Sequence, residues 1–551
     1  MASSAPATNG NRTASDFLTE LSVGSEVDKI LNDIKVNDFM KDTKPSKPPL
    51  SNGVSAQEIP PVTSILASFI SSARPSLLTP SLRAKLHEVI LDYIAVTAAG
   101  ATIAPSTEPI FNGILAFTGL PAAAPHYATS NGTTSTGCTT ITRGQTYPPQ
   151  YAALLNATFG HSLDFDDTHA ISSLHAGVTA IPAALACFES LALSPSQSSS
   201  PPTSDDLLLA ISLAYETTIR IGVALSTASY SRGFHNTSVA GIFGSIAAIA
   251  SLKKLSASAI ANAFGLAGSK AAGSMQYLAN GSWNKRLHPG FACHDAFLCV
   301  SLAEAGVIGA EKIIEGELGV LQAYTDRERS DVDWQRLIAG LGQKWEWEDS
   351  ALKPYAGCRM THAFIELSDH IGKEIREGKF ESKKVRKVVC TMPKANMILV
   401  GQKTKNKVRP ENMVDAQFSC YFQVANALCY GGTHDMAAYD RLQDPLIGVM
   451  AQRIECRVDE SMGGMSARME VVLENEEGSN SEVVKREQLE PLGEVSHPFV
   501  RELVEEKFLS LMAPVYGESR SKKVMECVYG IGKTKAESVR ELLDLIAWPQ
   551  K

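Results

Sequence analysis

The side chains best suited to chemistry are concentrated between Gly160 and Gly177. This stretch reads GHSLDFDDTHAISSLHAG and holds three aspartates, three histidines and a central threonine. Both flanks are apolar and rich in alanine, and carboxylates or imidazoles buried beside a core are costly unless they are paired, bind a metal or take part in function. Asp164 and His175 are suited to proton transfer, because histidine titrates near neutral pH and burial raises the pKa of an aspartate. We therefore interpret the stretch as half of an active site.

Two segments farther along the chain place imidazole and cationic groups where an anion can bind. His235 directly precedes a long apolar stretch, so it should lie near a helix N-terminus, where backbone N–H groups favour anions. A solvent-facing histidine in a capping segment is the alternative. Lys285, Arg286 and His288 fall in the segment GSWNKRLHPG, which is bounded by glycine and proline. A rigid loop with these donors fits a carboxylate or phosphate clamp, and an ordinary solvated basic loop is the alternative.

A third segment, LKPYAGCRMTHA, lies where the chain is expected to cross between domains, and domain interfaces often hold small-molecule sites. Its polar residues in an apolar context are Lys353, Tyr355, Cys358, Arg359 and His362. We interpret Cys358 as a free structural thiol and not as a nucleophile, because no neighbouring pattern indicates that it is activated.

The spacing of the acidic and imidazole groups does not match a known metal site. The pattern HxxDxDDxH contains residue types that bind metals, but it lacks the HExxH arrangement of zinc proteases and the glycine and terminal glutamate of an EF-hand. We therefore predict a site without metal.

Composition excludes several classes of protein. The chain has 551 residues, enough for two domains, and a formal net charge of -8, which argues against general nucleic-acid binding. The nearest approach to a membrane span is the apolar run 239–252, which is shorter than the roughly 20 residues required. The ten cysteines form no CxxC pair, which is typical of a reducing compartment. The cytoplasm is the expected location, with mitochondria as the alternative because no clear targeting signal is present.

The elements that must position these residues fall into four segments. Residues 1–58 are polar and poor in aromatics, and we expect disorder with a short helix near 16–34. Residues 59–345 show helical periodicity and many small side chains, which predicts a compact all-helical domain. Residues 346–492 predict an α/β module. Residues 493–551 are helical again and are expected to complete the first domain.

The individual elements follow from periodicity and turn residues. In the first domain we expect helices at 81–96, 147–162, 178–193, 205–226, 238–252, 256–272 and 291–306, with a surface loop at 195–205. In the second part we expect strands at 385–392, 453–459, 467–474 and 481–486, and helices at 361–377, 414–430, 498–512 and 520–547.

Taken together and in this order, the segments resemble the MmgE/PrpD family, which contains 2-methylcitrate dehydratases, fungal alkylcitrate dehydratases and cis-aconitate decarboxylases. The resemblance covers about residues 60–545 and rests on HSLDFDDTH with a histidine six residues later, NKRLHPG and LKPYAGCRMTHA. It implies a large all-helical domain with a smaller α/β lid. It also implies a homodimer that needs no cofactor.

The resemblance also assigns roles to residues. It implies catalytic roles for Asp164, Thr168, His175, His235, Lys285 and Lys353. Their neighbours in the same motifs are expected to bind substrate, namely Arg286, His288, Tyr355, Arg359 and His362. The mammalian-type decarboxylases resemble this chain less closely at one position: they carry a functional histidine five residues after the lid lysine, where this chain has Cys358. Members similar to the fungal decarboxylase have a cysteine there.

The expected substrate is a small tricarboxylic acid held by lysine and arginine, with no nucleic acid and no membrane as partner. The favoured reaction is dehydration of a 2-alkylcitrate or 2-methylcitrate, in which a base removes a proton beside a carboxylate and an acid protonates the leaving hydroxyl. The alternative is decarboxylation of a cis-aconitate-type acid to an itaconate. A third hypothesis, an inactive relative that serves as a binding protein, is disfavoured because Asp164, His175 and Lys285 are all present.

Overall fold

A computed structural model describes residues 59–119, 137–193, 201–380, 383–432, 434–475, 477–478, 480–533 and 537–548. The residues from Ile59 onward form one compact unit. The disorder predicted for residues 1–58, the helix predicted near 16–34 and most of the loop predicted at 195–205 lie outside the described residues.

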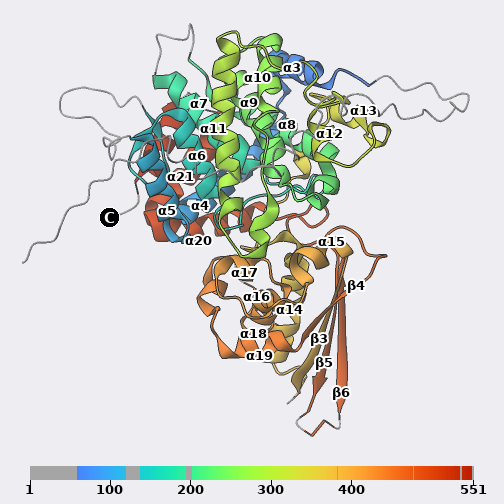
Figure 1. The fold of residues 1–551 in the computed structure, drawn as a ribbon. Coiled ribbons are helices and arrows are strands. Elements are labelled where there is room, and N and C mark those ends of the chain that lie inside the picture. The colour runs from blue at the N-terminus through green and yellow to red at the C-terminus, as the bar shows by residue number, and fades with distance from the viewer. Residues whose placement is uncertain are drawn as a thin grey trace, which may run out of the picture. The chain divides into compact units, whose positions relative to one another are not determined.

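The first part of the unit is a body of packed helices (Figure 1). Its longer helices are α3 (Val62–Ser72), α4 (Pro80–Ile103), α5 (Thr107–Thr118), α6 (Pro149–Gly160), α7 (Gly177–Leu193), α8 (Ser204–Ser231), α9 (Asn236–Lys253), α10 (Ala257–Ala267) and α11 (Asn284–Glu304). The short helices α12 (Val320–Tyr324) and α13 (Trp334–Ile338) and a small sheet of β1 (Cys138–Thr139) and β2 (Thr146–Tyr147) complete it. The predicted helical domain is therefore confirmed.

Helix α9 lies at the centre of this body and is buried over most of its length. Its small residues allow close contact with α7 and α8: a Cβ atom added at Gly244 would lie 1.9 Å from Thr218 Oγ1. At this contact, small side chains allow helix backbones to approach closely, as predicted.

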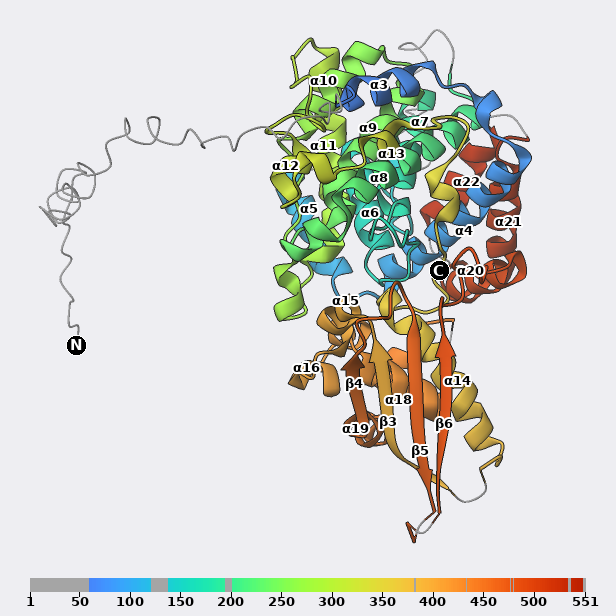
Figure 2. The same ribbon diagram turned by 90° about the vertical axis from the view of Figure 1, so that its right-hand side faces the viewer.

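Residues 346–492 contain a four-stranded sheet with helices on one side (Figure 2). The strands β3 (Lys384–Met392), β4 (Ile454–Val458), β5 (Ala467–Glu474) and β6 (Ser481–Gln488) lie in the order β4-β3-β5-β6, with β3 parallel to β4 and antiparallel to β5. Residues of β5 alternate between buried and half-buried, as expected for a sheet covered on one face. The covering helices are α14 (His362–Arg376) and α18 (Cys420–Tyr430). The predicted fold class, mainly helical with a smaller α/β second part, is confirmed.

The single helix predicted at 414–430 is wrong. The structure has two helices there, α17 (Met413–Gln417) and α18. The break has a local cause, because the Ser419 side chain accepts a hydrogen bond from the Phe422 backbone N–H at 2.9 Å and so starts a new helix. The helices α15 (Lys394–Asn396), α16 (Lys405–Val408) and α19 (Pro445–Gln452) complete this part.

The C-terminal helices return to the helical body. They are α20 (Arg501–Tyr516), α21 (Glu518–Gly530) and α22 (Glu537–Ala547), and α20 and α21 pack against α4 (Figure 2). The stretch predicted as one helix at 520–547 is divided into two. Helices α4 and α8 are long and apolar enough to cross a membrane, and both are mostly buried within the helical body.

The segment around Lys285 is not the loop that its glycine and proline predicted. Helix α11 begins at Asn284 and contains Pro289. Gly290 serves a contact between helices, since a Cβ atom there would lie 2.4 Å from Thr158 Oγ1 on α6. Lys285, Arg286 and His288 are therefore held on the first turns of a packed helix.

Candidate active site

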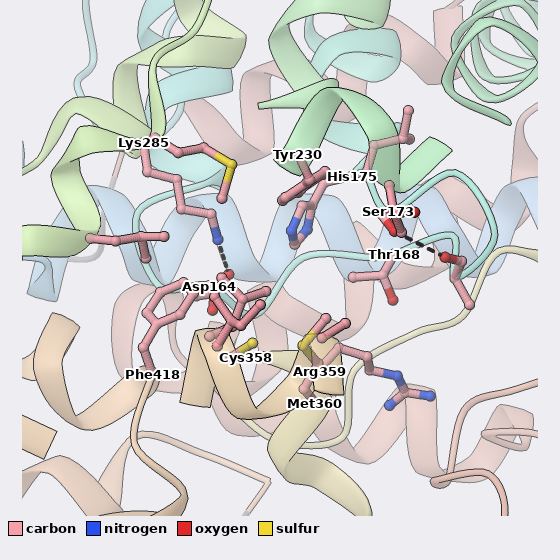
Figure 3. Close-up of a pocket in the computed structure, with 18 of the residues that line it drawn as sticks. Asp164, Thr168, Ser173, His175, Tyr230, Lys285, Cys358, Arg359, Met360 and Phe418 are labelled. Atoms are coloured by element: carbon pink, nitrogen blue, oxygen red, sulfur yellow. Dashed lines mark hydrogen bonds and ion pairs between the residues drawn. The ribbon is translucent and has the colours of Figure 1, made fainter. Parts of the chain in front are cut away.

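A cavity of about 320 Å³ lies where the loop between α6 and α7 meets the second part of the chain (Figure 3). The helical body contributes polar residues to it: Asp164, Thr168, His169, Ser173, His175, Tyr230 and Lys285. The crossing segment contributes Lys353, Cys358, Arg359 and Met360. The remaining wall is mostly apolar and includes Met275, Leu278, Ile398, Leu399, Phe418 and Met465. A cavity of this kind, with a few polar groups on an apolar wall, is typical of small-molecule sites.

Asp164 is the point at which two lysines converge. Lys285 Nζ forms an ion pair with Asp164 Oδ1, and Lys353 Nζ lies 3.2 Å from the same oxygen. Burial raises the pKa of Asp164, but Lys285 and Lys353 outweigh that effect and hold the pKa below its ordinary value. The expectation that burial would raise the pKa of Asp164 is therefore wrong: Asp164 is a carboxylate that neutralises one of two buried ammonium groups.

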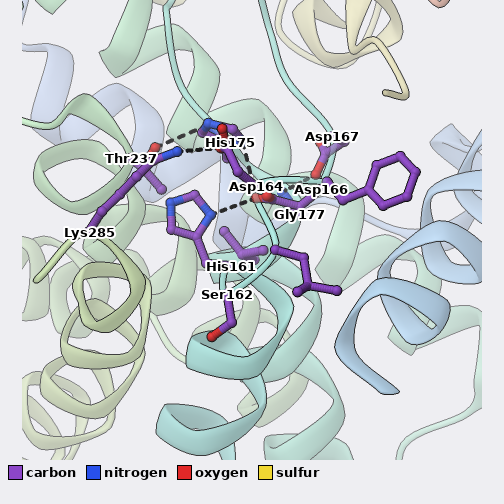
Figure 4. A network of polar contacts seen from close by, with 12 residues as sticks. His161, Ser162, Asp164, Asp166, Asp167, His175, Gly177, Thr237 and Lys285 are labelled. Atoms are coloured by element: carbon purple, nitrogen blue, oxygen red, sulfur yellow. Dashed lines mark hydrogen bonds and ion pairs between the residues drawn. The ribbon is translucent and has the colours of Figure 1, made fainter. Parts of the chain in front are cut away.

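Behind the cavity, one carboxylate contacts two histidines (Figure 4). Asp166 Oδ2 lies 2.8 Å from His161 Nδ1 and 3.1 Å from His175 Nδ1, the first with good hydrogen-bond geometry and the second at ion-pair distance. Burial lowers the pKa of His161 to about 3 and also lowers that of His175. Because Asp166 favours a proton on Nδ1 of His175, the Nε2 atom is the nitrogen left for a ligand.

Sequence reasoning assigned no role to His161 or Asp166. Both lie in the stretch 160–177, but the spacing of its residues does not indicate which histidine each aspartate contacts. His161, Asp166 and His175 also form a group whose ligand atoms lie within 4.8 Å of one another, close enough to hold a metal ion. Both imidazoles already face a single carboxylate oxygen of Asp166 at contact distance, so the absence of metal stays our prediction.

Two buried side-chain oxygen atoms of residues that line the cavity have no hydrogen-bond partner among the described residues. They are Asp164 Oδ2 and Thr168 Oγ1. Leaving such an atom unpaired costs about 1–3 kcal/mol, and native proteins contain few of them. Two on one cavity wall indicate that a ligand supplies the missing contacts.

The structure brings together five of the six residues to which the resemblance implied catalytic roles. Those five line the cavity: Asp164, Thr168, His175, Lys285 and Lys353. The sixth, His235, is fully buried outside the lining. Its Nδ1 atom lies 3.0 Å from His288 Nδ1, and its ring stacks on that of His161. His235 thus contacts the histidines behind the cavity and not the cavity itself.

The residues expected to bind substrate have other partners. Arg286 donates to Ser106 Oγ at 3.0 Å, and the Arg359 guanidinium donates to Glu494 at 2.8 Å, although the Arg359 side chain also lines the cavity. Figure 3 shows that guanidinium directed away from Asp164. These arginines are therefore not free carboxylate ligands in this structure.

His288, Tyr355 and His362 do not line the cavity. The Tyr355 ring packs between His362 and His434, and His362 Nδ1 lies 3.0 Å from Arg359 Nη1. Of these partners, only His434 lies outside the motif, so its contact with Tyr355 could not be inferred from the motif. Cys358 does line the cavity, and burial raises the pKa of its thiol, which argues against a nucleophilic thiolate.

Both parts of the chain match models of the same protein family. Residues 64–333 match the family model of the MmgE/PrpD N-terminal domain, and residues 355–529 match that of the MmgE/PrpD C-terminal domain. The chain is 25% identical over 507 residues to a cis-aconitate decarboxylase of Aspergillus terreus, an alignment that covers 89% of this chain and 96% of that protein.

Two other relatives align over shorter stretches. A cis-aconitate decarboxylase-like protein, oryM, of Aspergillus oryzae is 26% identical over 314 residues, covering 56% of this chain and 61% of that protein. The human cis-aconitate decarboxylase is 26% identical over 288 residues, covering 52% of this chain and 56% of that protein.

Proposed function

The chain belongs to the MmgE/PrpD family, and we propose that it is a carboxy-lyase that removes CO2 from a cis-aconitate-type tricarboxylic acid. The relatives described above are named as cis-aconitate decarboxylases or as similar to one. They support decarboxylation, the alternative in the sequence analysis, better than dehydration of a 2-alkylcitrate, which was favoured there. Enzymes that catalyse either reaction are lyases.

The observation that carries the proposal is the convergence of two lysines on one enclosed carboxylate. Lys285 comes from α11 and Lys353 from the crossing segment, and both reach Asp164 at the cavity wall. Ammonium groups in a site that excludes water attract carboxylates strongly. A substrate carboxylate would take over contacts that Asp164 now makes.

The residues also fit the charge changes of decarboxylation. When the bond to the leaving carboxylate breaks, its electron pair passes into the remaining unsaturated acid, and Lys285 and Lys353 stabilise that negative charge. A proton must then reach carbon, and we assign its delivery to Nε2 of His175. Burial lowers the pKa of free His175, with the lysines adding to this effect. A bound polyanion acts in the opposite direction, so the substrate itself favours the protonated imidazole.

The apolar wall supports a substrate class that includes acids with an apolar substituent. The same cavity is lined by Met275 and Leu278 from the helical body and by Ile398, Leu399 and Met465 from the second part. A bare tricarboxylate has no group to cover this wall. We therefore include an alkyl-substituted cis-aconitate in the proposed substrate class.

Turnover of a small panel of acids tests the reaction type. The purified protein would be incubated with citrate, 2-methylcitrate, a longer 2-alkylcitrate and cis-aconitate, with CO2 trapped and unsaturated acid followed by ultraviolet absorbance. The proposal expects CO2 from cis-aconitate and none from the citrates. Unsaturated tricarboxylate formed from a citrate without CO2 would establish dehydration instead, and binding without turnover would establish a binding protein.

A series of alkylated cis-aconitates tests the apolar wall. Each buried methylene contributes about 0.8 kcal/mol, roughly a fourfold gain. The efficiency kcat/KM should therefore rise by up to about fourfold per methylene until the wall is covered. If kcat/KM falls from the first added methylene, the apolar substituent is excluded while decarboxylation itself stands.

A further inference from the structure

Three consecutive carbonyl groups of the site loop are each held by a distant side chain. The donors come from α17, from the crossing segment and from the C-terminal helix α20, and all are buried. The contacts are Gln417 Nε2 to Leu163 O at 2.6 Å, Lys353 Nζ to Asp164 O at 2.9 Å and Lys507 Nζ to Phe165 O at 2.9 Å. The loop conformation is thus imposed from three separate parts of the chain.

The loop needs such support because its backbone is strained. Asp164 has a φ of 51°, in the left-handed region that costs a residue other than glycine about 1 kcal/mol or more. Such a conformation persists only where the surroundings impose it. The Phe165 carbonyl belongs to the peptide bond between Phe165 and Asp166. A donor at that oxygen therefore fixes the backbone between Asp164 and Asp166, the residue that contacts His175.

Lys507 contacts this loop from behind and is not among the residues that line the cavity. Its ammonium lies 2.6 Å from Asp92 Oδ1 of α4 and 3.8 Å from the centre of the Phe165 ring. Both members of the Lys507–Asp92 pair are buried. Buried ion pairs are weak contributors to stability, because desolvation offsets their attraction. The pair therefore requires an explanation other than stability.

We propose that Lys507, oriented by Asp92, is a positioning residue that holds the 165–166 peptide and thereby aligns Asp164 and Asp166 for catalysis. It acts through the Phe165 carbonyl and does not touch the substrate. The C-terminal helices thus contribute to the site as well as to the fold. The proposal rests on the proposed function only for its activity assay.

Lys507→Met tests the proposal, because it removes the donor and keeps most of the side-chain volume. We expect kcat to fall by about tenfold or more, the usual effect of losing one charge-assisted hydrogen bond, with KM changing less than about threefold. Lys507→Arg, which restores a charged donor, should recover part of the loss. Asp92→Asn weakens the contact that orients Lys507, so it should also lower kcat, but by less than Lys507→Met does.

Arg220→Met is the matched control. Arg220 is an equally buried cation that donates to Glu216 at 2.6 Å and to the Arg336 carbonyl at 3.0 Å, away from the cavity lining. Its loss should lower the melting temperature and leave kcat unchanged when both variants are assayed below their melting temperatures.

Hydrogen–deuterium exchange of the peptide covering residues 161–170 gives a readout that does not depend on which reaction the enzyme catalyses. Lys507→Met should increase exchange in this peptide by about tenfold or more, whereas Arg220→Met should not. If Lys507→Met leaves both kcat and this exchange unchanged, the positioning role is overturned. If the wild type catalyses no reaction of the panel but exchange responds as expected, the proposed function fails and the positioning role stands.

Discussion

At the scale of single residues, charge in the cavity is close to balance before any substrate binds. Lys285 and Lys353 bring two positive charges, and Asp164 returns one negative charge. The Arg359 guanidinium is engaged by Glu494. Under the proposed function, a tricarboxylate would enter a site with a small positive excess and add negative charge beside His175. That addition would make the protonation of His175 sensitive to substrate.

The pH dependence of turnover should report this sensitivity. Burial, with Lys285 and Lys353, places the pKa of His175 in the free enzyme below its ordinary value. The protonated form is then lost as pH rises through that lowered pKa, so kcat/KM should fall with rising pH, with an apparent pKa below about 6.5. In the complex the bound polyanion raises the pKa, so kcat should fall at a higher pH than kcat/KM.

The Lys285→Met variant tests whether the lysines lower the pKa of His175. Lys285→Met removes one positive neighbour of His175, so the descending limb of its kcat/KM profile should move to higher pH than in the wild type. A profile that rises with pH through this range would instead make His175 a base, and the assigned proton delivery would be wrong.

Sequence patterns could identify several of the polar residues that line the cavity but not their partners. Five cavity residues lie in short motifs that can be recognised without knowing the rest of the fold. They are Asp164, Thr168, His175, Lys285 and Lys353. Where the side chains of the remaining residues point depends on residues far away in sequence. His235 meets His288, and Arg359 meets Glu494 across 135 positions. No periodicity or spacing could predict those contacts.

At the scale of elements, a buried acid, Asp167, connects the loop between α6 and α7 to the start of α7. Asp167 Oδ1 accepts a hydrogen bond from the Gly177 backbone N–H at 3.1 Å, at the start of α7. Burial, with the nearby carboxylates Asp166 and Asp92, raises the pKa of Asp167 to about 8. Gly177 is required there, because a Cβ atom would lie 2.3 Å from Asp167 Oδ1.

Asp167 should therefore make stability depend on pH. In the unfolded chain its pKa is about 4, so its contribution to the free energy of unfolding is fully present below that pH and is lost as pH rises through about 8. The contribution should decline by up to about 1.4 kcal/mol per pH unit. Asp167→Asn mimics the neutral form and should remove this decline.

Denaturant unfolding of both proteins between pH 6.5 and pH 8 measures the difference. Free energies of unfolding that decline in parallel for the wild type and Asp167→Asn would show that Asp167 is ionised in the folded protein.

Helices and strands were easiest to predict where periodicity alone determines the element. They were hardest to predict where a single contact determines the beginning or end of the element. The four strands of the second part follow from alternation and turn residues, and they form as expected. The start of α11 at Asn284 was missed because Pro289 and Gly290 indicated a loop, whereas Gly290 serves close packing against α6. The break before α18 was missed because it depends on one serine side chain, that of Ser419.

At the scale of the whole molecule, the site loop is held by residues that lie far apart in the sequence. The loop at 160–177 lies in the helical body, Lys353 in the crossing segment and Lys507 in the C-terminal helices. Composition and periodicity could predict a helical body with an α/β part, but they could not predict that the last helices would support the first motif.

The first 58 residues should be dispensable for this arrangement. Their composition is too polar to bury enough apolar surface to offset the entropy of ordering them. A chain that begins at Ile59 should keep its melting temperature within about 2 °C and its turnover within about twofold. A larger loss in either measurement, by calorimetry or by the CO2 assay, would show that this segment supports the folded body or an assembly of two copies.

The central claim is that Lys285 and Lys353 hold a tricarboxylate while it loses CO2, and carbon-13 NMR of uniformly labelled cis-aconitate mixed with the enzyme tests it most directly. For the wild type we predict one labelled CO2 released for each unsaturated dicarboxylate formed. In Lys285→Met and Lys353→Met, each folded as judged by circular dichroism, the rate should fall by at least about tenfold, because each charge-assisted contact contributes about 1.5–3 kcal/mol. Unchanged CO2 release by both folded variants, or conversion of labelled acid without CO2, would contradict the account.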